Sequence, residues 1–116
     1  MAERSADADP TADVLDLTYA ALASPTRRAI LGLLRDDQAR VTDIARVFPA
    51  SLATVSKHIQ VLERAGLVRR EVRGRDHYLR ADPANLDAAE EWIAEYTSFW
   101  ERSADALARH VEGDAR

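Results

Sequence analysis

Residues 51–81 read SLATVSKHIQVLERAGLVRREVRGRDHYLRA, and this stretch decides the fold. Its first half has the apolar periodicity of a helix, and its second half alternates in the manner of two short strands, 68–72 and 77–81. Between the strands, residues 73–76 (RGRD) have the composition of a hairpin turn. The stretch therefore predicts a helix followed directly by a small β-hairpin that carries several arginines.

The helix is expected to begin at Ser51, whose hydroxyl can cap it, and to end before Gly66, a residue suited to the left-handed conformation. Val55, Ile59 and Leu62 lie at i, i+4 and i+7, which is the spacing of a stripe that packs on the rest of a domain. The opposite face is polar. This division predicts a helix that lies at the surface with one side free to contact a partner.

Three helices are expected before this one, over 12–23, 25–36 and 42–48. In the third, Thr42 is expected to act as the cap, and the apolar face is expected to contain Ile44, Val47 and Phe48. The turn 49–51 is tight, so the third and fourth helices together form a helix-turn-helix.

Asp82-Pro83 combines a capping residue with a proline and predicts the start of a long helix over 84–111. Residues 1–10 are small, polar and acidic, and we expect a disordered tail there. The remainder, 11–116, is expected to be one domain. Within it, residues 42–81 form the part that we expect to contact a partner molecule, and residues 83–112 form a helix that we expect to meet a second copy of the chain.

The chain has 116 residues and no cysteine, which excludes disulfides and thiolate metal sites. No apolar run approaches the roughly 18 residues that span a bilayer, and residues 1–13 lack the layout of a signal peptide. We therefore expect a cytoplasmic protein with no membrane partner.

Charge is distributed unevenly along the chain. The net charge is −4, yet residues 41–80 carry 8 Lys/Arg and 4 Asp/Glu, whereas residues 81–116 carry 3 and 9. Because the local field matters more than the total charge for docking, the middle segment is the one expected to contact an anionic polymer.

The predicted fourth helix and hairpin are suited to DNA. A helix fits the major groove, a cationic hairpin can lie along the neighbouring phosphates, and the first turns of such a helix reach base edges most readily. Thr54 and Lys57 are therefore expected to touch bases, while Ser51 caps the helix beside a phosphate. The candidates for DNA contact in this segment are Ser51, Thr54, Lys57, His58, Gln60, Arg73 and Arg75.

Some candidates have a structural alternative. His58 can equally be a half-buried packing residue, and Gln60 can be part of a solvated face. Arg27 and Arg28 lie in the first turn of the second helix, where the helix dipole disfavours cations unless an anion such as phosphate is nearby. They are either phosphate contacts or solvated surface arginines. Tyr78 is expected to pack the hairpin against the core.

Four segments resemble, in their order and spacing, the ArsR family of winged helix-turn-helix transcriptional repressors. These segments are LASPTRRAILGLL, VTDIA, VSKHIQVLERAGLV and GRDHYLRA. The resemblance covers roughly residues 19–82, and WIAEYTSFWERSADAL resembles the last helix of a cysteine-free subgroup. It implies a mainly α fold with a small β-hairpin that dimerises through its terminal helices. It also implies a homodimer that binds double-stranded DNA at a palindromic operator and leaves it when a signal arrives.

The chain departs from the family pattern in two places. Metal-sensing members carry a cysteine pair near the third helix, where this chain has residues 40–42 (RVT), and others bind zinc through ligands at fixed spacing in the last helices. Because His58, His77 and His110 fall in three different elements, we expect no metal. The second departure is Leu52, where many members carry a glutamine. A leucine there can contact a thymine methyl group or simply pack.

The last predicted helix carries an aromatic stripe that is too apolar to be left in water. Burial against a second copy of the chain, together with the first helix, is the favoured interpretation, and a pocket for a small apolar effector is the alternative. The residues expected at the dimer interface are Leu15, Tyr19, Trp92, Tyr96, Phe99, Trp100 and Leu107.

The sequence favours no catalytic class. It has no G-x-S-x-G nucleophile turn, no glycine loop that would hold a phosphate, and four glycines in all. We therefore expect no enzyme and no cofactor. The alternative function is a winged-helix module that binds protein and not DNA, although such modules tend to lose the cationic hairpin and polar helix face that are present here.

Overall fold

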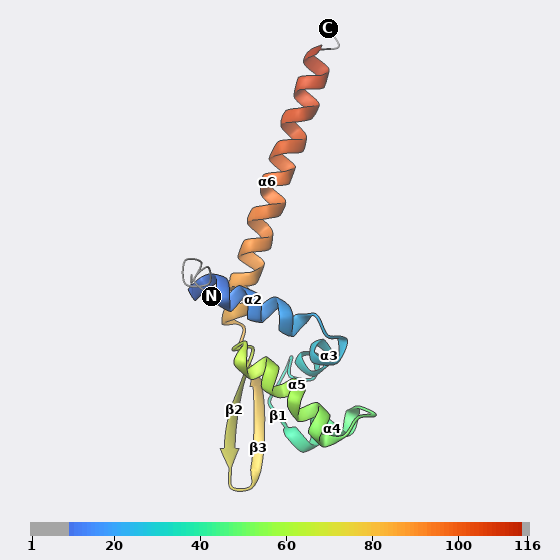
Figure 1. Ribbon diagram of the computed structural model, residues 1–116, viewed down its shortest axis with the longest axis vertical. Coiled ribbons are helices and arrows are strands. Elements are labelled where there is room, and N and C mark those ends of the chain that lie inside the picture. Colours follow the sequence, from blue (N-terminus) through green and yellow to red (C-terminus); the bar gives the residue numbers. More distant parts are fainter. Residues whose placement is uncertain (1–9, 115–116) are drawn as a thin grey trace, which may run out of the picture.

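A group of helices and a small antiparallel sheet make up the computed structural model, which describes residues 10–114, and the β-hairpin extends away from the helices (Figure 1). The described helices are α2 (Pro10–Leu22), α3 (Pro25–Leu33), α4 (Val41–Val47), α5 (Leu52–Arg64) and α6 (Ala84–Asp114). The strands are β1 (Ala39–Arg40), β2 (Val68–Arg73) and β3 (Asp76–Ala81). This arrangement confirms the predicted winged helix-turn-helix. The predicted disordered tail lies outside the described residues except for Pro10, which begins α2.

The predicted base-contacting helix is α5, and its apolar stripe forms the centre of the core. Val55, Ile59 and Leu62 are fully buried, as predicted. The Ser51 hydroxyl caps α5 by accepting a 3.1 Å hydrogen bond from the Thr54 amide, and Gly66 follows the helix with a φ of +72°. Local patterns therefore placed both ends of α5 correctly.

The sheet has the strand order β1-β3-β2. Arg73 pairs with Asp76, so the hairpin turn contains two residues rather than the predicted four. Its first residue, Gly74, has a φ of +63°, as a tight hairpin turn requires. The additional strand β1 pairs with the middle of β3 and was not predicted, because two residues carry no periodic signal.

Helix α4 differs from the prediction in its start and its buried face. It begins at Val41 after Arg40, which makes no side-chain capping bond, so the prediction that Thr42 caps it was wrong. Val41 and Ile44 are buried, whereas Val47 is 59% exposed and does not belong to the apolar face. The i, i+3, i+4, i+7 series that starts at Val41 contains Ile44, Ala45 and Phe48, and it leaves Val47 outside the packed face.

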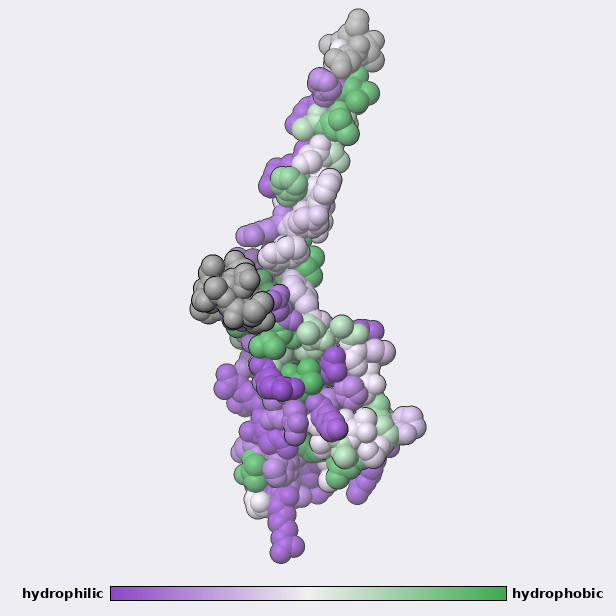
Figure 2. Space-filling view, in the orientation of Figure 1, coloured by the Kyte–Doolittle hydropathy of each residue, from purple (hydrophilic) through white to green (hydrophobic). Residues whose placement is uncertain are grey.

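Helix α6 leaves the body of the molecule as a long projection (Figure 1). It contains 31 residues, and the molecule measures 73 × 38 × 23 Å along its principal axes. Its first turns pack on α2, where the Tyr19 hydroxyl donates a 2.9 Å bond to the Ala89 carbonyl. Figure 2 shows strongly hydrophilic surface over the hairpin and apolar patches along the projecting helix. No helix within residues 10–114 combines the length and apolar character needed to cross a membrane.

Candidate nucleic-acid interface

The outer face of α5 carries four of the predicted DNA contacts. Ser51, Thr54, Lys57 and Gln60 are all exposed. Lys57 and Gln60 make no hydrogen bond or ion pair with any described residue, so both side chains are free to meet a ligand. The structure therefore brings these candidates together on one solvent-facing side of a helix whose other side is the core.

Ser51 and Thr54 organise the start of α5. The two hydroxyl oxygens lie 3.0 Å apart in addition to the amide bond that caps the helix. Both side chains stay exposed, so each oxygen retains capacity for a further hydrogen bond. The helix start thus presents two positioned hydroxyl groups to solvent.

His58 and Arg27 form a contact on the opposite flank of α5. The His58 ring is half-buried, and its Nδ1 atom lies 3.1 Å from a terminal nitrogen of Arg27. Because a guanidinium group can only donate, Nδ1 accepts and the ring hydrogen sits on Nε2. The structure thus gives His58 the packing environment that the sequence left as its alternative.

Arg27 and Arg28 both donate hydrogen bonds to backbone carbonyl groups at the end of α2. Arg27 donates to the carbonyl oxygens of Ala20 and Ala21 at 2.9 and 2.7 Å. Arg28 donates to Leu22 at 2.6 Å. These oxygens end α2, so the negative end of one helix dipole compensates both cations at the positive start of the next. The two helix ends lie close together because only Ala23 and Ser24 separate α2 from α3.

Arg73 and Arg75 of the hairpin differ in how many partners their side chains have. One terminal nitrogen of Arg73 donates to Glu71 and to Gln38, both at 3.0 Å, and its guanidinium lies 4.5 Å from the Tyr78 ring centre. The Glu71 carboxylate raises the pKa of Arg73, and Arg73 in turn lowers the pKa of Glu71. Arg75, in the turn, has no such partner among the described residues. Arg75 is therefore the freer of the two cations.

Tyr78 does not anchor the hairpin as predicted. The neighbouring Leu79 is fully buried in the core, while Tyr78 is half-buried on the other face, beside Arg73. Alternation along a strand sends successive side chains to opposite faces, so only one of the two can point inward.

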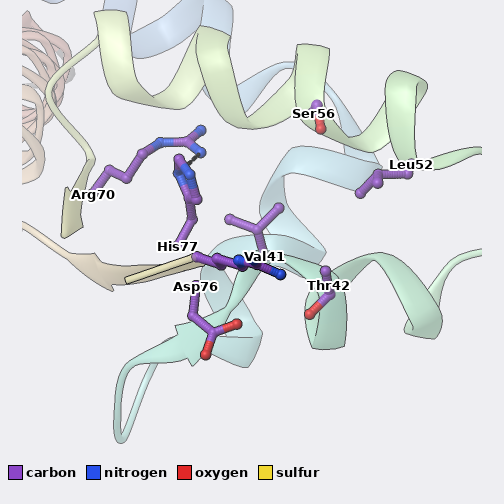
Figure 3. A pocket seen from close by; sticks show the side chains of 8 residues that line it. Val41, Thr42, Leu52, Ser56, Arg70, Asp76 and His77 are labelled. Carbon is purple, nitrogen blue, oxygen red and sulfur yellow. Dashed lines mark hydrogen bonds between the residues drawn. The ribbon is translucent and has the colours of Figure 1, made fainter. Parts of the chain in front are cut away.

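A cavity of about 210 Å³ lies between α4, α5 and the hairpin (Figure 3). At this cavity, Arg70 of β2 contacts Glu63 and His77. The sequence did not predict that these three residues lie together. Arg70 donates two bonds to the Glu63 carboxylate, at 3.1 and 2.8 Å, and its other terminal nitrogen lies 2.9 Å from Nδ1 of His77. The cavity is lined by Val41, Thr42, Leu52, Ser56, Arg70, Arg75, Asp76 and His77.

This Arg70 cluster fixes the hairpin relative to α5. Glu63 lies on α5, and the bidentate contact holds β2 at a set orientation to it. The carboxylate raises the pKa of Arg70, the larger effect being the hydrogen bond. Arg69 and Arg70 lie on opposite faces of β2, as alternation along a strand requires, but no local pattern connects Arg70 with Glu63.

The predicted dimer residues divide into two groups. Leu15 and Tyr19 are half-buried where α2 meets α6. The Trp92 and Tyr96 rings stack 5.4 Å apart, and Tyr19 meets Trp92 edge-on at 6.4 Å. The α6 members remain exposed along one side of the projection: Trp92 49%, Tyr96 51%, Phe99 53%, Trp100 55% and Leu107 64%.

Among the described residues, no three His, Asp or Glu side chains gather closely enough to hold a metal ion. The charged groups near α5 and the hairpin instead form ion pairs or face solvent as cations. Lys57 and Arg75 are cations on this surface that have no hydrogen-bond or ion-pair partner among the described residues.

Comparison with known proteins identifies the family of this chain. Residues 22–71 match a helix-turn-helix domain family. The HTH-type transcriptional regulator Rv2034 of Mycobacterium tuberculosis is 32% identical over 99 residues, which is 85% of this chain and 90% of that protein.

Solved structures share the fold, among them the following two. A crystal structure of an ArsR family transcriptional regulator is 37% identical, has a TM-score of 0.74, and aligns with 77% of this chain and 92% of its own. A homodimeric winged helix-turn-helix DNA-binding domain from Mycobacterium bovis, described as a possible ArsR-family regulator, is 29% identical with a TM-score of 0.59 and aligns with 92% and 90%. This chain is therefore a member of the ArsR family of winged helix-turn-helix transcriptional regulators.

Proposed function

We propose that the protein binds a specific DNA sequence as a homodimer and represses transcription from a palindromic operator. One observation carries the proposal: the first turns of α5 and the hairpin turn border the same cavity, through Leu52 and Ser56 on one side and Arg75 on the other. A groove-binding helix and a phosphate-binding hairpin must face one duplex together, and this shared border supports that arrangement.

The homodimer is supported by the exposed stripe of α6. Four large aromatic side chains, each about half exposed, lie within nine consecutive positions of one helix. An apolar surface of this kind is typical of an interaction site, and the Mycobacterium bovis relative is described as homodimeric. In a two-fold dimer both α5 helices are related by the same axis, so the matching operator is a palindrome.

In this proposal, the dimer represses transcription by occupying the operator. The described surface offers DNA-contacting and dimerising features, and a dimer that spans two half-sites prevents other proteins from using that DNA. The place of action is the cytoplasm. A small apolar effector is the alternative occupant of the stripe, and it would bind beside Trp92 and Tyr96 and alter the spacing of the two modules.

The test is a mobility-shift titration with DNA from upstream of the protein's own gene and with scrambled DNA. Lys57→Ala is expected to weaken binding to the specific site, whereas Arg75→Ala is expected to weaken binding to both DNAs and to reduce the salt dependence. Arg109→Ala is the matched control, because Arg109 is an exposed cation on α6. Equal affinity for all four proteins, or no DNA binding at all, would favour the protein-binding alternative.

A further inference from the structure

The cavity between α4, α5 and the hairpin is bordered by a side of α5 that is not its base-contacting face. Leu52 and Ser56 lie one turn apart on this side, and both line the cavity. At about 100° per residue, Thr54 and Lys57 lie well round the helix from Leu52. Helix α4 lies across the opening, and the hairpin closes a further side (Figure 3). The cavity is therefore distinct from the face that the proposed function assigns to base contact.

One wall of the cavity is apolar. It is formed by Val41, which is buried, and by Leu52, which is 52% exposed in the single chain. A bound molecule can cover the exposed part of Leu52, and removing this apolar surface from water favours binding. Pockets for drug-sized ligands measure roughly 300–1,000 Å³, so a volume of about 210 Å³ suits a smaller molecule with a compact apolar body.

The charges around the cavity leave one cation without a counterion. The Glu63 carboxylate balances Arg70 at 2.8 Å, and the Asp76 carboxylate lies 3.8 Å from the Arg40 guanidinium. Arg75, which also lines the cavity, forms no ion pair or hydrogen bond within residues 10–114. A ligand that carries one negative charge therefore complements this cavity.

Neutral hydrogen-bond donors accompany this cation. The hydroxyl groups of Thr42 and Ser56 line the cavity and have no partner in the described part of the chain. The His77 ring adds another donor, because its Nδ1 atom accepts from Arg70 and its hydrogen is therefore on Nε2. A carboxylate accepts several hydrogen bonds through its two oxygens, so it can use a cation and neutral donors together.

We propose that this cavity binds a small ionised carboxylic acid with an apolar body, and that the bound acid competes with DNA for Arg75. The carboxylate meets Arg75 and the hydroxyl groups, and the apolar body covers Leu52. The competition rests on the proposed function, which assigns Arg75 to a DNA phosphate, whereas the binding of the acid does not. This cavity differs from the aromatic stripe of α6 in both position and chemistry.

Benzoate, which has one ring and one carboxylate, is the probe. Added to the isotope-labelled full-length protein, it is expected to shift the amide NMR signals of Thr42, Ser56 and Arg75, with a Kd on the order of 1 mM. Benzamide has the same shape without the charge and is expected to bind at least about tenfold more weakly. Acetate lacks the apolar body and is also expected to bind more weakly than benzoate.

Substitutions test the two halves of the cavity separately. Arg75→Ala is expected to weaken benzoate binding about tenfold and to remove the preference over benzamide. Leu52→Ala is expected to weaken benzoate binding about fourfold and to leave acetate binding unchanged. Arg109→Ala, which removes an exposed cation of α6, is the matched control and should bind benzoate as the unmodified protein does.

Fluorescence-anisotropy titrations with labelled DNA measure the competition, with chloride added to match the ionic strength. Saturating benzoate is expected to raise the Kd of the unmodified protein for its DNA by the same factor as Arg75→Ala does. It is expected to have no effect on the Arg75→Ala protein, because the ligand and the substitution act on one group. Benzamide at the same concentration is expected to change nothing.

Each result has a different consequence. Equal Kd values for benzoate and benzamide, undiminished benzoate binding by Arg75→Ala, or signals that shift only along α6 would overturn the carboxylate site. Benzoate binding beside Arg75 with unchanged DNA affinity would overturn the competition. A protein that binds benzoate in the cavity but binds no DNA would overturn the proposed function and leave the carboxylate site in place.

Discussion

The side-chain amide of Asn85, in the first turn of α6, donates a 2.7 Å hydrogen bond to the carbonyl oxygen of Ala65, which ends α5. Carbonyl groups at the end of a helix have no partner within it, so this bond satisfies one of them. A Cβ atom on the adjacent Gly66 would lie 2.5 Å from the Asn85 amide nitrogen. The contact therefore ties the proposed DNA-contacting helix directly to the proposed dimerisation helix.

We expect Asn85→Ala to lower the free energy of unfolding by about 1 kcal/mol, because one partly buried hydrogen bond is lost and a carbonyl group is left without its partner. Urea denaturation followed by circular dichroism measures this difference. Gln60→Ala is the control, since Gln60 carries the same kind of polar group on α5 without a hydrogen bond in the described chain. Equal stability of the two variants would mean that the Asn85 bond contributes nothing.

Arg27 has a structural role that its sequence position concealed. Its guanidinium joins the end of α2 to His58 of α5 through three contacts, and Arg28 makes one exposed contact. Arg27→Ala is therefore expected to cost about 2 kcal/mol of stability, and Arg28→Ala less than about 1 kcal/mol. Thermal denaturation gives the comparison. If instead Arg27→Ala left stability intact and reduced the salt dependence of DNA binding, Arg27 would be a phosphate contact.

The elements that could be predicted from sequence are those fixed by neighbouring residues. The α5 stripe, its Ser51 cap and the Gly66 end are local patterns, and all three are confirmed. What could not be predicted depends on tertiary contact. Strand β1 exists only because β3 lies beside it, and Arg70 meets Glu63 only because the hairpin folds back on α5.

The same distinction applies to the candidate site. Composition identified Arg73 and Arg75 as hairpin cations, but it could not show that Arg73 is held by Glu71 and Gln38 while Arg75 is free. A carboxylate and an amide from distant positions decide which cation is available. The availability of a charged group is therefore a property of the folded chain.

Glu71→Gln is expected to increase DNA affinity. The change removes a negative charge from the hairpin and releases Arg73, and one charge within the screening length is worth roughly a threefold change in Kd. A titration at low and at physiological salt measures the effect, which should shrink as salt rises. Glu112→Gln removes an exposed carboxylate from the far end of α6 and is expected to change nothing. A weaker complex for Glu71→Gln would show that Glu71 positions Arg73 for DNA.

Asp82 makes stability depend on pH in the acid range. The hydrogen bond from Arg69, and then the bond from the Ala84 amide, lower the pKa of Asp82 below its ordinary value of 3.8. A group whose pKa is lower in the folded state stabilises that state above the unfolded pKa, and the contribution disappears as pH falls through the folded pKa. The advantage of the unmodified protein over Asp82→Asn should therefore be present at about pH 5 and shrink below about pH 3.8.

Thermal denaturation of both proteins across that range provides the measurement for Asp82. Asp105→Asn serves as the control, because Asp105 is exposed on α6 and has no hydrogen bond in the described chain. A difference between the unmodified protein and Asp82→Asn that stays constant down to about pH 2 would exclude the linkage to Arg69 and the α6 start.

The exposed aromatic stripe of α6 predicts that the protein is a dimer in solution. A chain of 12.9 kDa should sediment at about twice that mass at micromolar concentration. Trp100→Glu places a charge in the stripe, and desolvating that charge opposes association. Because Trp100 is 55% exposed in the single chain, the variant should keep its fold and become a monomer. Glu101→Gln changes the neighbouring residue and should stay dimeric.

The monomeric variant also separates assembly from DNA contact. Each copy of Trp100→Glu keeps its own α5 and hairpin, so it should still bind a single half-site, but weakly. It should lose the added affinity that comes from engaging two half-sites at once, because the second contact is no longer intramolecular. If Trp100→Glu bound the full operator as tightly as the unmodified protein while sedimenting as a monomer, α6 would have no part in operator recognition, and the stripe would have to serve a different partner.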